Sequence, residues 1–547
     1  MFRYGIKFIK YTLNCQRKRF IVNCICTLNT VWNMVTQVIS GTTVGIEGHK
    51  IIVETDIAGG VPAIIIVGLP DTAMNEARER IRGAFRNSNI DFPIHKVVIN
   101  LAPADLKKEG SLYDLPMAVG ILTANGDIDI TKLDNTAFMG ELSLDGSIRS
   151  VAGILPIVLG LKEQGITRVF VPKDNQAEAA LVEGVEVYGL SHLCEVLEFF
   201  SDEKAEEPKL KPFKIDIKKY LQDNFEENPL YDFKDVKGQQ KAKRALEIAA
   251  AGGHNILMVG SPGAGKTLLS KCFTGILPPL ELSEAMELTK IYSISGLVEK
   301  DKPLVTKRPF RPVHHSASAV GITGGGSNPK PGEITLAHRG TLFLDEVVEF
   351  PRQVLEVLRQ PLEDGMVTIT RAQHSIRFPA DFTLLAAMNP CPCGFHGDST
   401  KECTCSPFQI QRYWAKLSGP LLDRIDIQIN VPRLKEDELL SQADGEPSKV
   451  IRERVIRARN LQLERFKDEN IVCNSQMLPK QIKRYCALDE ATKMVLKNAI
   501  TKFNLSGRAY DRILKLSRTI ADLDNSVKIE TKHILEAIQY RNLDRQG

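Results

Sequence analysis

The segment "GSPGAGKT" combines small residues, one lysine and one hydroxyl at a spacing that suits phosphate binding. It follows the apolar run "NILMVG" and precedes "LLSKCFTGIL", which predicts a strand, a glycine loop and a helix. Backbone N–H groups in such a loop surround phosphates, and the helix N-terminus adds a positive dipole end. A chance glycine turn is the alternative, and the number of constrained positions weighs against it. The expected nucleotide-binding residues are Gly260, Ser261, Pro262, Gly263, Ala264, Gly265, Lys266 and Thr267.

Two adjacent carboxylates follow a second apolar run, in "GTLFLDEV". We expect Lys266 to reach the β- and γ-phosphates of ATP, and Thr267 and Asp345 to hold Mg²⁺. Glu346 would then polarise the attacking water. Paired acidic residues are also common in turns, so this pair alone is not specific. The glycine loop earlier in the chain is what points the pair to phosphate chemistry.

Three further polar residues are candidates for the same reaction. Asn389 ends the apolar run "FTLLAAMN", where an amide can align water and γ-phosphate. Arg424 in "GPLLDRIDI" would, if exposed, enter a neighbouring subunit's site, because guanidinium stabilises charge on transferred phosphoryl oxygens. Its alternative is a salt bridge to a flanking aspartate. Arg508 in "LSGRAYDRILKLSR" begins a predicted helix and could reach phosphate, with Arg512 as its substitute and an ordinary surface arginine as its alternative.

Four cysteines lie close together directly after Asn389, at Cys391, Cys393, Cys403 and Cys405. Paired C-x-C arms around a short loop can bring four thiolates together, which predicts a structural Zn²⁺ site. His396 could replace one sulfur. The alternatives are a metal-free loop and a reversible disulfide.

The composition sets limits on the class of protein. The chain has 547 residues, which is too long for one core, and a net charge of only +4. Nucleic-acid binding would therefore need a local basic surface. Eleven cysteines, seven of them scattered, do not form a disulfide framework, and this favours the reducing cytoplasm. No apolar run is long enough to span a membrane, so we expect no membrane partner.

Periodicity and composition divide the chain into segments. Strand-like runs alternate with turns from Val38 to Leu69, and "TAMNEARERIRGAFRNS" has helical spacing. The charged stretch "SDEKAEEPKLKP" is typical of a linker. We expect a disordered extension at 1–33, a first domain at 34–200, a linker at 201–228, an α/β ATPase domain at 229–434 with a cysteine-rich insertion at 391–405, and a helical lid at 435–547.

The order of these motifs resembles the AAA+ ATPases of the magnesium-chelatase and replicative-helicase branch, and more narrowly the ComM (YifB) family. The resemblance rests on "GLPDTAMNEARERIRGAF", "NLAPADLKKEGSLYDLPMA", "FRPVHHSASAVGITGGG", "PKPGEITLAHRGTLFLDE" and "AAMNPCPCG". It implies an α/β fold class: a Lon-protease-like (ribosomal S5 domain 2-like) α+β domain, an AAA+ domain with a parallel sheet, and a helical lid. It also implies ATP and Mg²⁺ as ligands, a sensor Asn389, a trans-acting Arg424 and a lid Arg508.

The first domain resembles the proteolytic domain of Lon-type proteases without its reactive pair. Those enzymes use a serine–lysine dyad, in which the lysine takes the serine's proton. The serine position falls on Leu112 and the lysine position on Leu155, while Ser111 is one residue away. A leucine cannot act as a general base, so we expect this fold to lack peptidase activity.

Two segments are candidates for contact with DNA. Residues 311–334 contain a glycine run, the pair His314 and His315, and Lys330, and residues 366–382 alternate like a hairpin with Arg371 and His374 near its tip. Basic loops that face a central channel bind nucleic-acid phosphate without reading sequence. Ordinary solvated loops are the alternative. The family resemblance implies a homo-hexamer that drives DNA branch migration in recombination and natural transformation. A chelatase-like ATPase that acts through partner subunits, and a scaffold that only binds ATP, remain open.

Overall fold

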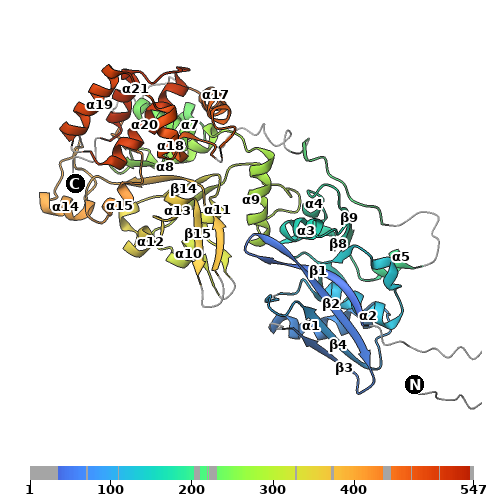
Figure 1. The fold of residues 1–547 in the computed structure, drawn as a ribbon. Coiled ribbons are helices and arrows are strands. Elements are labelled where there is room, and N and C mark those ends of the chain that lie inside the picture. Colours follow the sequence, from blue (N-terminus) through green and yellow to red (C-terminus); the bar gives the residue numbers. More distant parts are fainter. Residues whose placement is uncertain are drawn as a thin grey trace, which may run out of the picture.

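The structure is a computed structural model of the chain, and it shows three units in sequence order (Figure 1). An α+β domain comes first, an α/β unit with a parallel sheet follows, and a helical unit ends the chain, which confirms the expected fold class. The predicted extension at 1–33 lies outside the described residues. The structure describes residues 35–68, 72–108, 110–201, 210–218, 220, 231–326, 329–370, 375–398, 400–434, 445–469, 471–503 and 505–541.

The first domain is built on a seven-stranded mixed sheet in the order β3-β4-β2-β1-β5-β8-β9. β2 alternates in burial at its centre, where Ile51, Val53 and Thr55 point inward, as expected for a strand with one covered face. The β1–β2 and β2–β4 pairs are antiparallel, and the other pairs are parallel. The strands are β1 (Thr36–Val44), β2 (Glu47–Ala58), β3 (Ala63–Val67), β4 (Lys96–Ala102), β5 (Thr136–Phe138), β8 (Arg168–Pro172) and β9 (Glu186–Leu190), with a small hairpin of β6 (Glu141–Leu142) and β7 (Ile148–Arg149).

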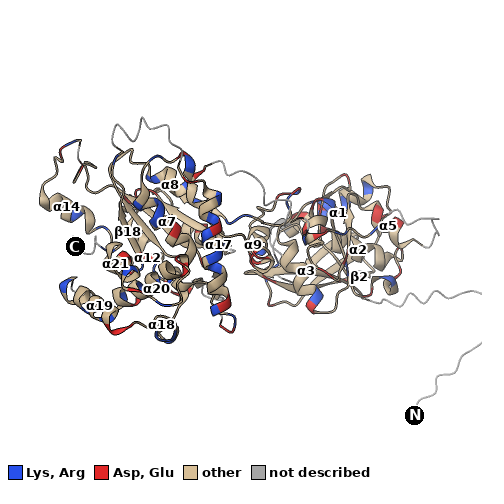
Figure 2. Ribbon diagram, turned by 90° about the horizontal axis from the view of Figure 1, so that it is seen from above, with Lys and Arg blue, Asp and Glu red and all other residues tan. Residues whose placement is uncertain are grey.

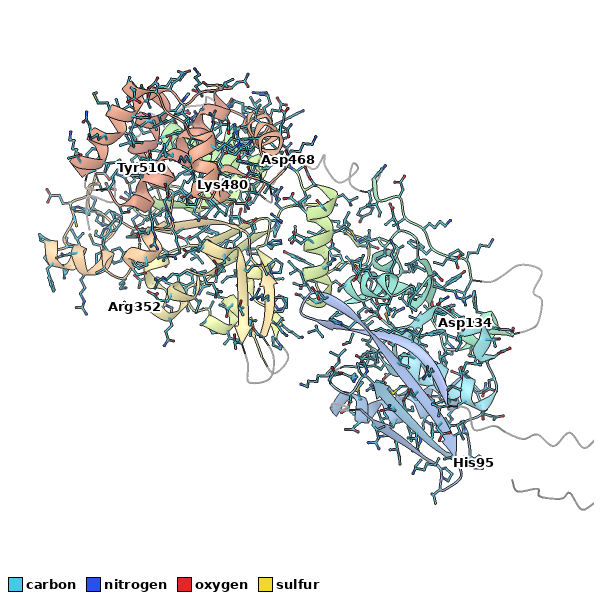
Figure 3. The ribbon with its side chains drawn as sticks, viewed as in Figure 1. His95, Asp134, Arg352, Asp468, Lys480 and Tyr510 are labelled. Atoms are coloured by element: carbon cyan, nitrogen blue, oxygen red, sulfur yellow. The ribbon has the colours of Figure 1, made fainter. Side chains whose placement is uncertain are left out.

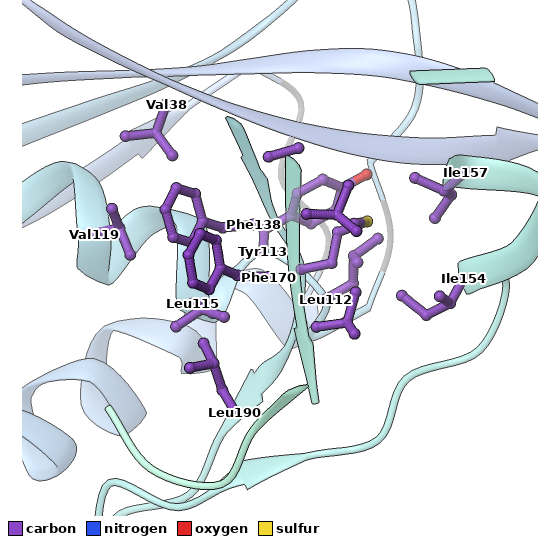
Figure 4. Close-up of a cluster of buried hydrophobic side chains, with 14 of the residues drawn as sticks. Val38, Leu112, Tyr113, Leu115, Val119, Phe138, Ile154, Ile157, Phe170 and Leu190 are labelled. Atoms are coloured by element: carbon purple, nitrogen blue, oxygen red, sulfur yellow. The ribbon is translucent and has the colours of Figure 1, made fainter. Parts of the chain in front are cut away.

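Helices and an aromatic cluster complete the core of this domain (Figure 4). The rings of Phe138 and Phe170 stack with centroids 4.9 Å apart, and α2 is buried along most of its length because it packs on β1 and β2. Close packing of this kind explains why α2 is apolar on all sides. The helices are α1 (Thr72–Asn87), α2 (Asp114–Asn125), α3 (Ile154–Glu163), α4 (Gln176–Ala179) and α5 (Cys194–Phe200).

The second unit contains a five-stranded parallel sheet in the order β11-β14-β17-β10-β18. Its central strands are buried on both faces, which is why they are continuous apolar runs in the sequence. The chain order reverses beside β10, and in open parallel sheets ligands bind outside the carboxyl ends of the strands at such a point. The strands are β10 (Ile256–Val259), β11 (Phe310–Val313), β14 (Thr341–Leu344), β17 (Thr383–Met388) and β18 (Ile427–Asn430).

Short helices and two hairpins surround this sheet. The alternating segment at 366–382 forms the predicted antiparallel hairpin, in which Thr368 pairs with Arg377. The helices are α7 (Gln240–Gly252), α8 (Lys266–Phe273), α9 (Leu282–Ile294), α10 (Ala319–Thr323), α11 (Glu333–Leu336), α12 (Arg352–Val357), α13 (Pro361–Asp364), α14 (Pro407–Trp414) and α15 (Gly419–Leu422), and the hairpins are β12 (Gly324–Gly325) with β13 (Lys330–Pro331) and β15 (Met366–Thr370) with β16 (Ser375–Pro379).

The C-terminal unit is helical, as its sequence predicted. Its helices α17 and α20 pack on α7, and their apolar side chains join one core with those of α7 and α8. Figure 3 shows Lys480 and Tyr510 on this unit and Arg352 on the sheet unit below it. The helices are α17 (Ser448–Arg465), α18 (Pro479–Tyr485), α19 (Glu490–Phe503), α20 (Gly507–Leu523) and α21 (Thr531–Gln539).

Helix α9 joins the second unit to the first domain. In Figure 1 it stands between them, beside α3. Ala285 and Leu288 of α9, with Leu280 before it, are buried in the core of the first domain. The N–H of Gly153 donates to the carbonyl of Ser293, at 3.0 Å. The first domain and the second unit are therefore held together by a buried apolar contact.

The described part of the expected linker packs on the first domain. Ile217 is buried in that domain's core, Leu210 and Ile215 pack against it, and the N–H of Phe213 donates to the carbonyl of Val187. Its apolar residues explain why residues 210–218 are docked and do not form a free linker. In the described part of the chain, no helix has the length and apolarity that a membrane span requires.

Candidate active site

The glycine loop connects β10 to α8 at the carboxyl edge of the parallel sheet. Gly263 and Gly265 have φ angles of 79° and 90°, which L side chains rarely adopt, so glycine lets the chain turn around an open space here. Gly265 is also the N-cap of α8, whose first residue is Lys266. The loop therefore presents backbone N–H groups and a helix N-terminus to one point.

Lys266 and Asn389 meet beside this loop. The buried ammonium of Lys266 donates to the carbonyl of Gly260 at 2.6 Å, to that of Ser261 at 3.1 Å and to Oδ1 of Asn389 at 3.2 Å. Burial lowers the pKa of Lys266, and the carboxylates of Asp345 and Glu346 oppose that shift. A cation that is partly desolvated gains most from an anionic partner, which phosphate provides.

Thr267 and Asp345, which we expected to hold Mg²⁺, contact each other. The Thr267 hydroxyl donates to Oδ2 of Asp345 at 2.9 Å, so two oxygen ligands from α8 and the tip of β14 already lie together. Hydroxyl and carboxylate oxygens are the donors that Mg²⁺ prefers, so these residues fit the ion. Asp345 Oδ1 also accepts the N–H of Glu346, which has a φ of 50°. This left-handed conformation turns the Glu346 side chain outward, where it is 55% exposed.

The sequence did not reveal a partner for Glu346. Nδ1 of His315 lies 3.8 Å from the Glu346 carboxylate, and its ring packs against that of His314 at an interplanar angle of 34°, with centroids 4.0 Å apart. His315 follows β11, which pairs with β14 in parallel, and this neighbour relation brings the two side chains together. Strand order decides this contact, and no local motif encodes it.

Arg424 lies at the opposite edge of the sheet. It precedes β18, whose first residue pairs with the first residue of β10, whereas the glycine loop follows the last residue of β10. A four-residue strand spans roughly 13 Å. The side chain is only 11% exposed, pairs with Glu363, and donates to the carbonyl of Pro420 at 2.7 Å. We expected an exposed arginine or a pair with a flanking aspartate, and the contact with Glu363 on α13 replaces both.

Arg508 and Arg512 lie at the same edge as Arg424. Arg508 is 61% exposed and its guanidinium is 3.7 Å from Asp423, while Arg512 is 3.4 Å from the buried Asp426. All three arginines line one cavity of about 570 Å³ between the sheet unit and the helical unit. The structure therefore groups Arg508 with Arg424, and not with its own subunit's glycine loop.

The four cysteines converge. Their sulfur atoms all lie within 4.8 Å of one another, and Cys391 is buried. The Cys391 sulfur is 3.3 Å from that of Cys393 and 3.6 Å from that of Cys403. The N–H of Phe395 lowers the pKa of the Cys393 thiol, whereas burial and the neighbouring sulfur atoms raise the pKa values of Cys403 and Cys405. His396 contributes its N–H to Cys391 and is not needed as a fourth ligand.

The predicted DNA-contact residues are only partly described. Lys330 is exposed on β13, in the hairpin with β12. Arg371 and His374 lie outside the described residues. In Figure 2 the ribbon is coloured blue at Lys and Arg positions throughout the described part of the chain, with several along α17.

The first domain contains leucines where Lon-type enzymes have their reactive pair. Leu112 and Leu155 belong to the buried core, and Figure 4 shows Leu112 among apolar side chains. The Ser111 hydroxyl contacts the carboxylate of Glu141. Lys108 is fully buried, and its ammonium contacts the carbonyl of Pro103. No lysine is paired with Ser111 in the described contacts of this domain.

Three family descriptions match consecutive parts of the chain. Residues 53–175 match "Subunit ChlI of Mg-chelatase", residues 232–439 match "Magnesium chelatase, subunit ChlI", and residues 445–541 match "Magnesium chelatase, subunit ChlI C-terminal". The first of these lies within the α+β domain, and the other two cover the sheet unit and the helical unit. All three units thus resemble parts of one known protein.

Curated relatives match over nearly the whole length. Competence protein ComM of Haemophilus influenzae is 43% identical over 511 residues, which are 93% of this chain and 97% of the relative. The uncharacterized protein YifB of Escherichia coli is 41% identical over 92% of this chain and 96% of its own length. Lon protease 2 of Bacillus subtilis is 34% identical over 132 residues, 24% of this chain and 22% of the relative. The chain therefore belongs to the ComM/YifB family of magnesium-chelatase-like AAA+ proteins.

Proposed function

We propose that the chain is an ATP-hydrolysing motor that works as a homo-hexamer on DNA and promotes branch migration during recombination and natural transformation. The observation that supports the ATPase most strongly is the meeting of four side chains at one sheet edge. Lys266 and Thr267 begin α8, and Asp345 and Asn389 follow β14 and β17. Lys266 contacts Asn389 there, and Thr267 contacts Asp345.

Within one subunit, each of these residues has a distinct role. Lys266 exchanges its carbonyl partners for the β- and γ-phosphate oxygens of ATP, because an anion stabilises a buried ammonium better than a neutral carbonyl does. Thr267 and Asp345 hold Mg²⁺, which neutralises charge on the phosphates. Glu346 accepts a proton from the attacking water, and Asn389 orients that water towards the γ-phosphate. His315 positions the Glu346 carboxylate through its 3.8 Å contact.

Arg424 and Arg508 act on the nucleotide that is bound to the neighbouring subunit. Arg424 and Arg508 lie at the amino edge of the sheet, away from their own glycine loop. In the proposed ring, the edge that carries Arg424 would face the glycine loop of the next subunit, so a single subunit would have an incomplete site. Arg424 leaves Glu363 for the γ-phosphate, where guanidinium stabilises the transition-state charge.

DNA is the proposed substrate of the motor. The relative named Competence protein ComM is 43% identical across almost the full chain, which supports a role in DNA uptake or recombination. Lys330, with Arg371 and His374, would contact phosphates in the channel without sequence preference. We propose the cytoplasm as the location, because a site of four free thiols persists in a reducing compartment.

We further propose that Cys391, Cys393, Cys403 and Cys405 bind one structural Zn²⁺. Four sulfur ligands without an open position are typical of structural zinc, and the separations of the sulfur atoms suit a tetrahedron. The ion would stiffen the loop that follows Asn389. It takes no part in hydrolysis, since the hydrolytic carboxylates lie at Asp345 and Glu346.

A chelatase-like function is the second candidate. The matches to magnesium-chelatase subunit ChlI support ATP use that drives metal insertion through partner subunits. The match to ChlI of Olisthodiscus luteus is only 25% identical over 30% of this chain, whereas ComM matches 93% of it. The first domain does not separate the two functions, because its residues 53–175 match a description of the chelatase subunit ChlI.

Steady-state ATP hydrolysis with and without forked or three-way DNA tests these alternatives. Stimulation by DNA together with strand displacement is expected for the motor. A rate of ATP hydrolysis that is the same with and without DNA would favour the chelatase-like function. Complete lack of hydrolysis would leave a scaffold that binds ATP as a structural ligand.

A further inference from the structure

The cysteine loop lies directly against the glycine loop. Gly394, between two of the cysteines, has a φ of 84°, and a Cβ atom added there would come within 2.7 Å of Pro262. Glycine is thus required for the close approach of the two loops. Cys391 comes only two residues after Asn389. The cysteine loop therefore adjoins the candidate nucleotide site at two places, Asn389 and Pro262.

Asp398 makes the polar connection between the loops. It accepts the N–H groups of Thr400 and Lys401, which fix its side chain within the cysteine loop. Its side chain is 2% exposed, and the pKa of Asp398 is well below its usual range because the carboxylate lies beside the Ser261 hydroxyl and accepts hydrogen bonds from Thr400. Ser261 is the second residue of the glycine loop.

Arg433 also contacts both loops, because it pairs with Asp398 and donates a hydrogen bond to Pro262. Its Nε lies 3.5 Å from Oδ2 of Asp398, and its NH2 group donates to the carbonyl of Pro262 at 3.1 Å. The guanidinium also covers the ring of Phe395, with 5.4 Å to the ring centroid. Asp398 is therefore connected to Pro262 through Arg433, and its carboxylate lies beside Ser261.

The position of Asp398 depends on the four sulfur atoms. Residues 391–405, apart from Ser399, are described, and they contain neither helix nor strand, so no backbone ladder fixes their shape. The sulfur atoms of Cys393 and Cys403 are 3.6 Å apart, and tetrahedral zinc with Zn–S bonds of about 2.3 Å places its sulfur ligands about 3.8 Å apart. A disulfide would need a sulfur separation of about 2.05 Å. The arrangement fits one metal ion and not two disulfides.

We propose that the metal-filled cysteine loop is a clamp on the glycine loop, so that occupancy of the four thiolates by a thiolate-preferring divalent cation such as Zn²⁺ sets the affinity for ATP. This inference rests on the proposed zinc site and adds a consequence to it. Removal of the ion frees the segment around Asp398, and Ser261 and Pro262 lose their support. The glycine loop must then be ordered when nucleotide binds, which weakens binding.

Binding of a fluorescent ATP analogue, measured beside the zinc content of the same full-length sample, tests the clamp. Wild-type protein purified without added metal should contain about one zinc per chain. Asp398→Asn should keep its zinc and bind the analogue about tenfold more weakly, because a hydrogen bond to a buried charge is lost. Glu402→Gln removes an exposed carboxylate of the same loop and should change neither quantity.

Two further samples separate the clamp from the zinc site. Cys391→Ser/Cys403→Ser should lose both zinc and affinity, and wild-type protein treated with a chelator should lose affinity and regain it with Zn²⁺ but not with Mg²⁺. Less than about half an equivalent of zinc in the wild type, unchanged in the double variant, would refute the zinc site and with it the clamp. Bound zinc with unchanged nucleotide affinity in Asp398→Asn and after chelation would refute the clamp and leave the zinc site standing.

Discussion

The ammonium of Lys266 lies 3.2 Å from the amide oxygen of Asn389, which is 123 positions further along the chain. The contact arises because β10 and β17 are parallel neighbours, with Val259 opposite Met388. Both strands therefore end at the same height, and the residues that follow them meet. This pair connects the part of the site that binds phosphate to the part that would sense it.

Replacement of Lys266 tests the phosphate contact. Lys266→Ala should lower ATP turnover at least about a hundredfold, because the phosphates lose their main counter-charge. Lys271→Ala is the matched control, since Lys271 is on the same helix and contacts Tyr231. Steady-state phosphate release measures both. Near-normal turnover in Lys266→Ala would contradict the assignment.

Glu346→Gln separates binding from hydrolysis. The amide keeps the shape of the side chain but accepts no proton, so the variant should bind ATP and fail to hydrolyse it, which traps the assembled form. Glu349→Gln, three residues later and paired with Lys416, should behave as wild type. Nucleotide binding and single-turnover hydrolysis are the measurements. Retained hydrolysis in Glu346→Gln would show that another group is the base.

Mixed assemblies test whether Arg424 acts across the subunit interface. Arg424→Ala should bind nucleotide and lose hydrolysis, and Lys266→Ala should also be inactive alone. When the two variants are mixed, some interfaces combine an intact glycine loop with an intact arginine, so part of the activity should return. Mixtures that co-assemble without any recovery would exclude action in trans.

The first domain should lack peptidase activity. Ser111 contacts Glu141 and has no lysine as general base among its described contacts, and Leu155 occupies the lysine position in the core. Casein and fluorogenic peptides should therefore not be cleaved, with or without ATP. Turnover that disappears in Ser111→Ala would overturn this expectation.

Acid should weaken the attachment of α9 through Glu287. Burial alone would raise the pKa of Glu287, but its contacts with His338 and Arg339 lower it from 4.5 to about 2. A depressed pKa means that the stabilisation is present above pH 4.5 and is lost as the pH falls towards 2. The difference in Tm between wild type and Glu287→Gln should therefore shrink over that range. A constant difference would argue against this ion pair.

Local motifs predicted the parts of the site that lie next to each other in sequence. The glycine loop and the acidic pair at the end of β14 could be recognised because strand, loop and helix must follow in that order. The hairpin at 366–382 was also predicted, since alternation and a turn are local properties. Fold class followed from the same patterns together with the family resemblance.

Contacts between segments that are distant in the sequence could not be predicted from local motifs. Glu363 holds Arg424 because α13 lies beside the start of β18, and nothing near either residue encodes this pair. The same is true of His315 with Glu346 and of Asp398 with Ser261. The expected linker was wrong for residues 210–218, because three apolar side chains in a charged stretch were enough to dock it.

The burial of α9 in the first domain also limits how this protein can be divided. A chain shortened to residues 231–547 would expose Ala285 and Leu288 to water, with Leu280 and Leu304 beside them. Such a fragment would expose an apolar patch on α9, and exposed apolar patches favour aggregation. A recombinant fragment that starts at residue 231 therefore needs polar replacements on α9 before it can be handled alone.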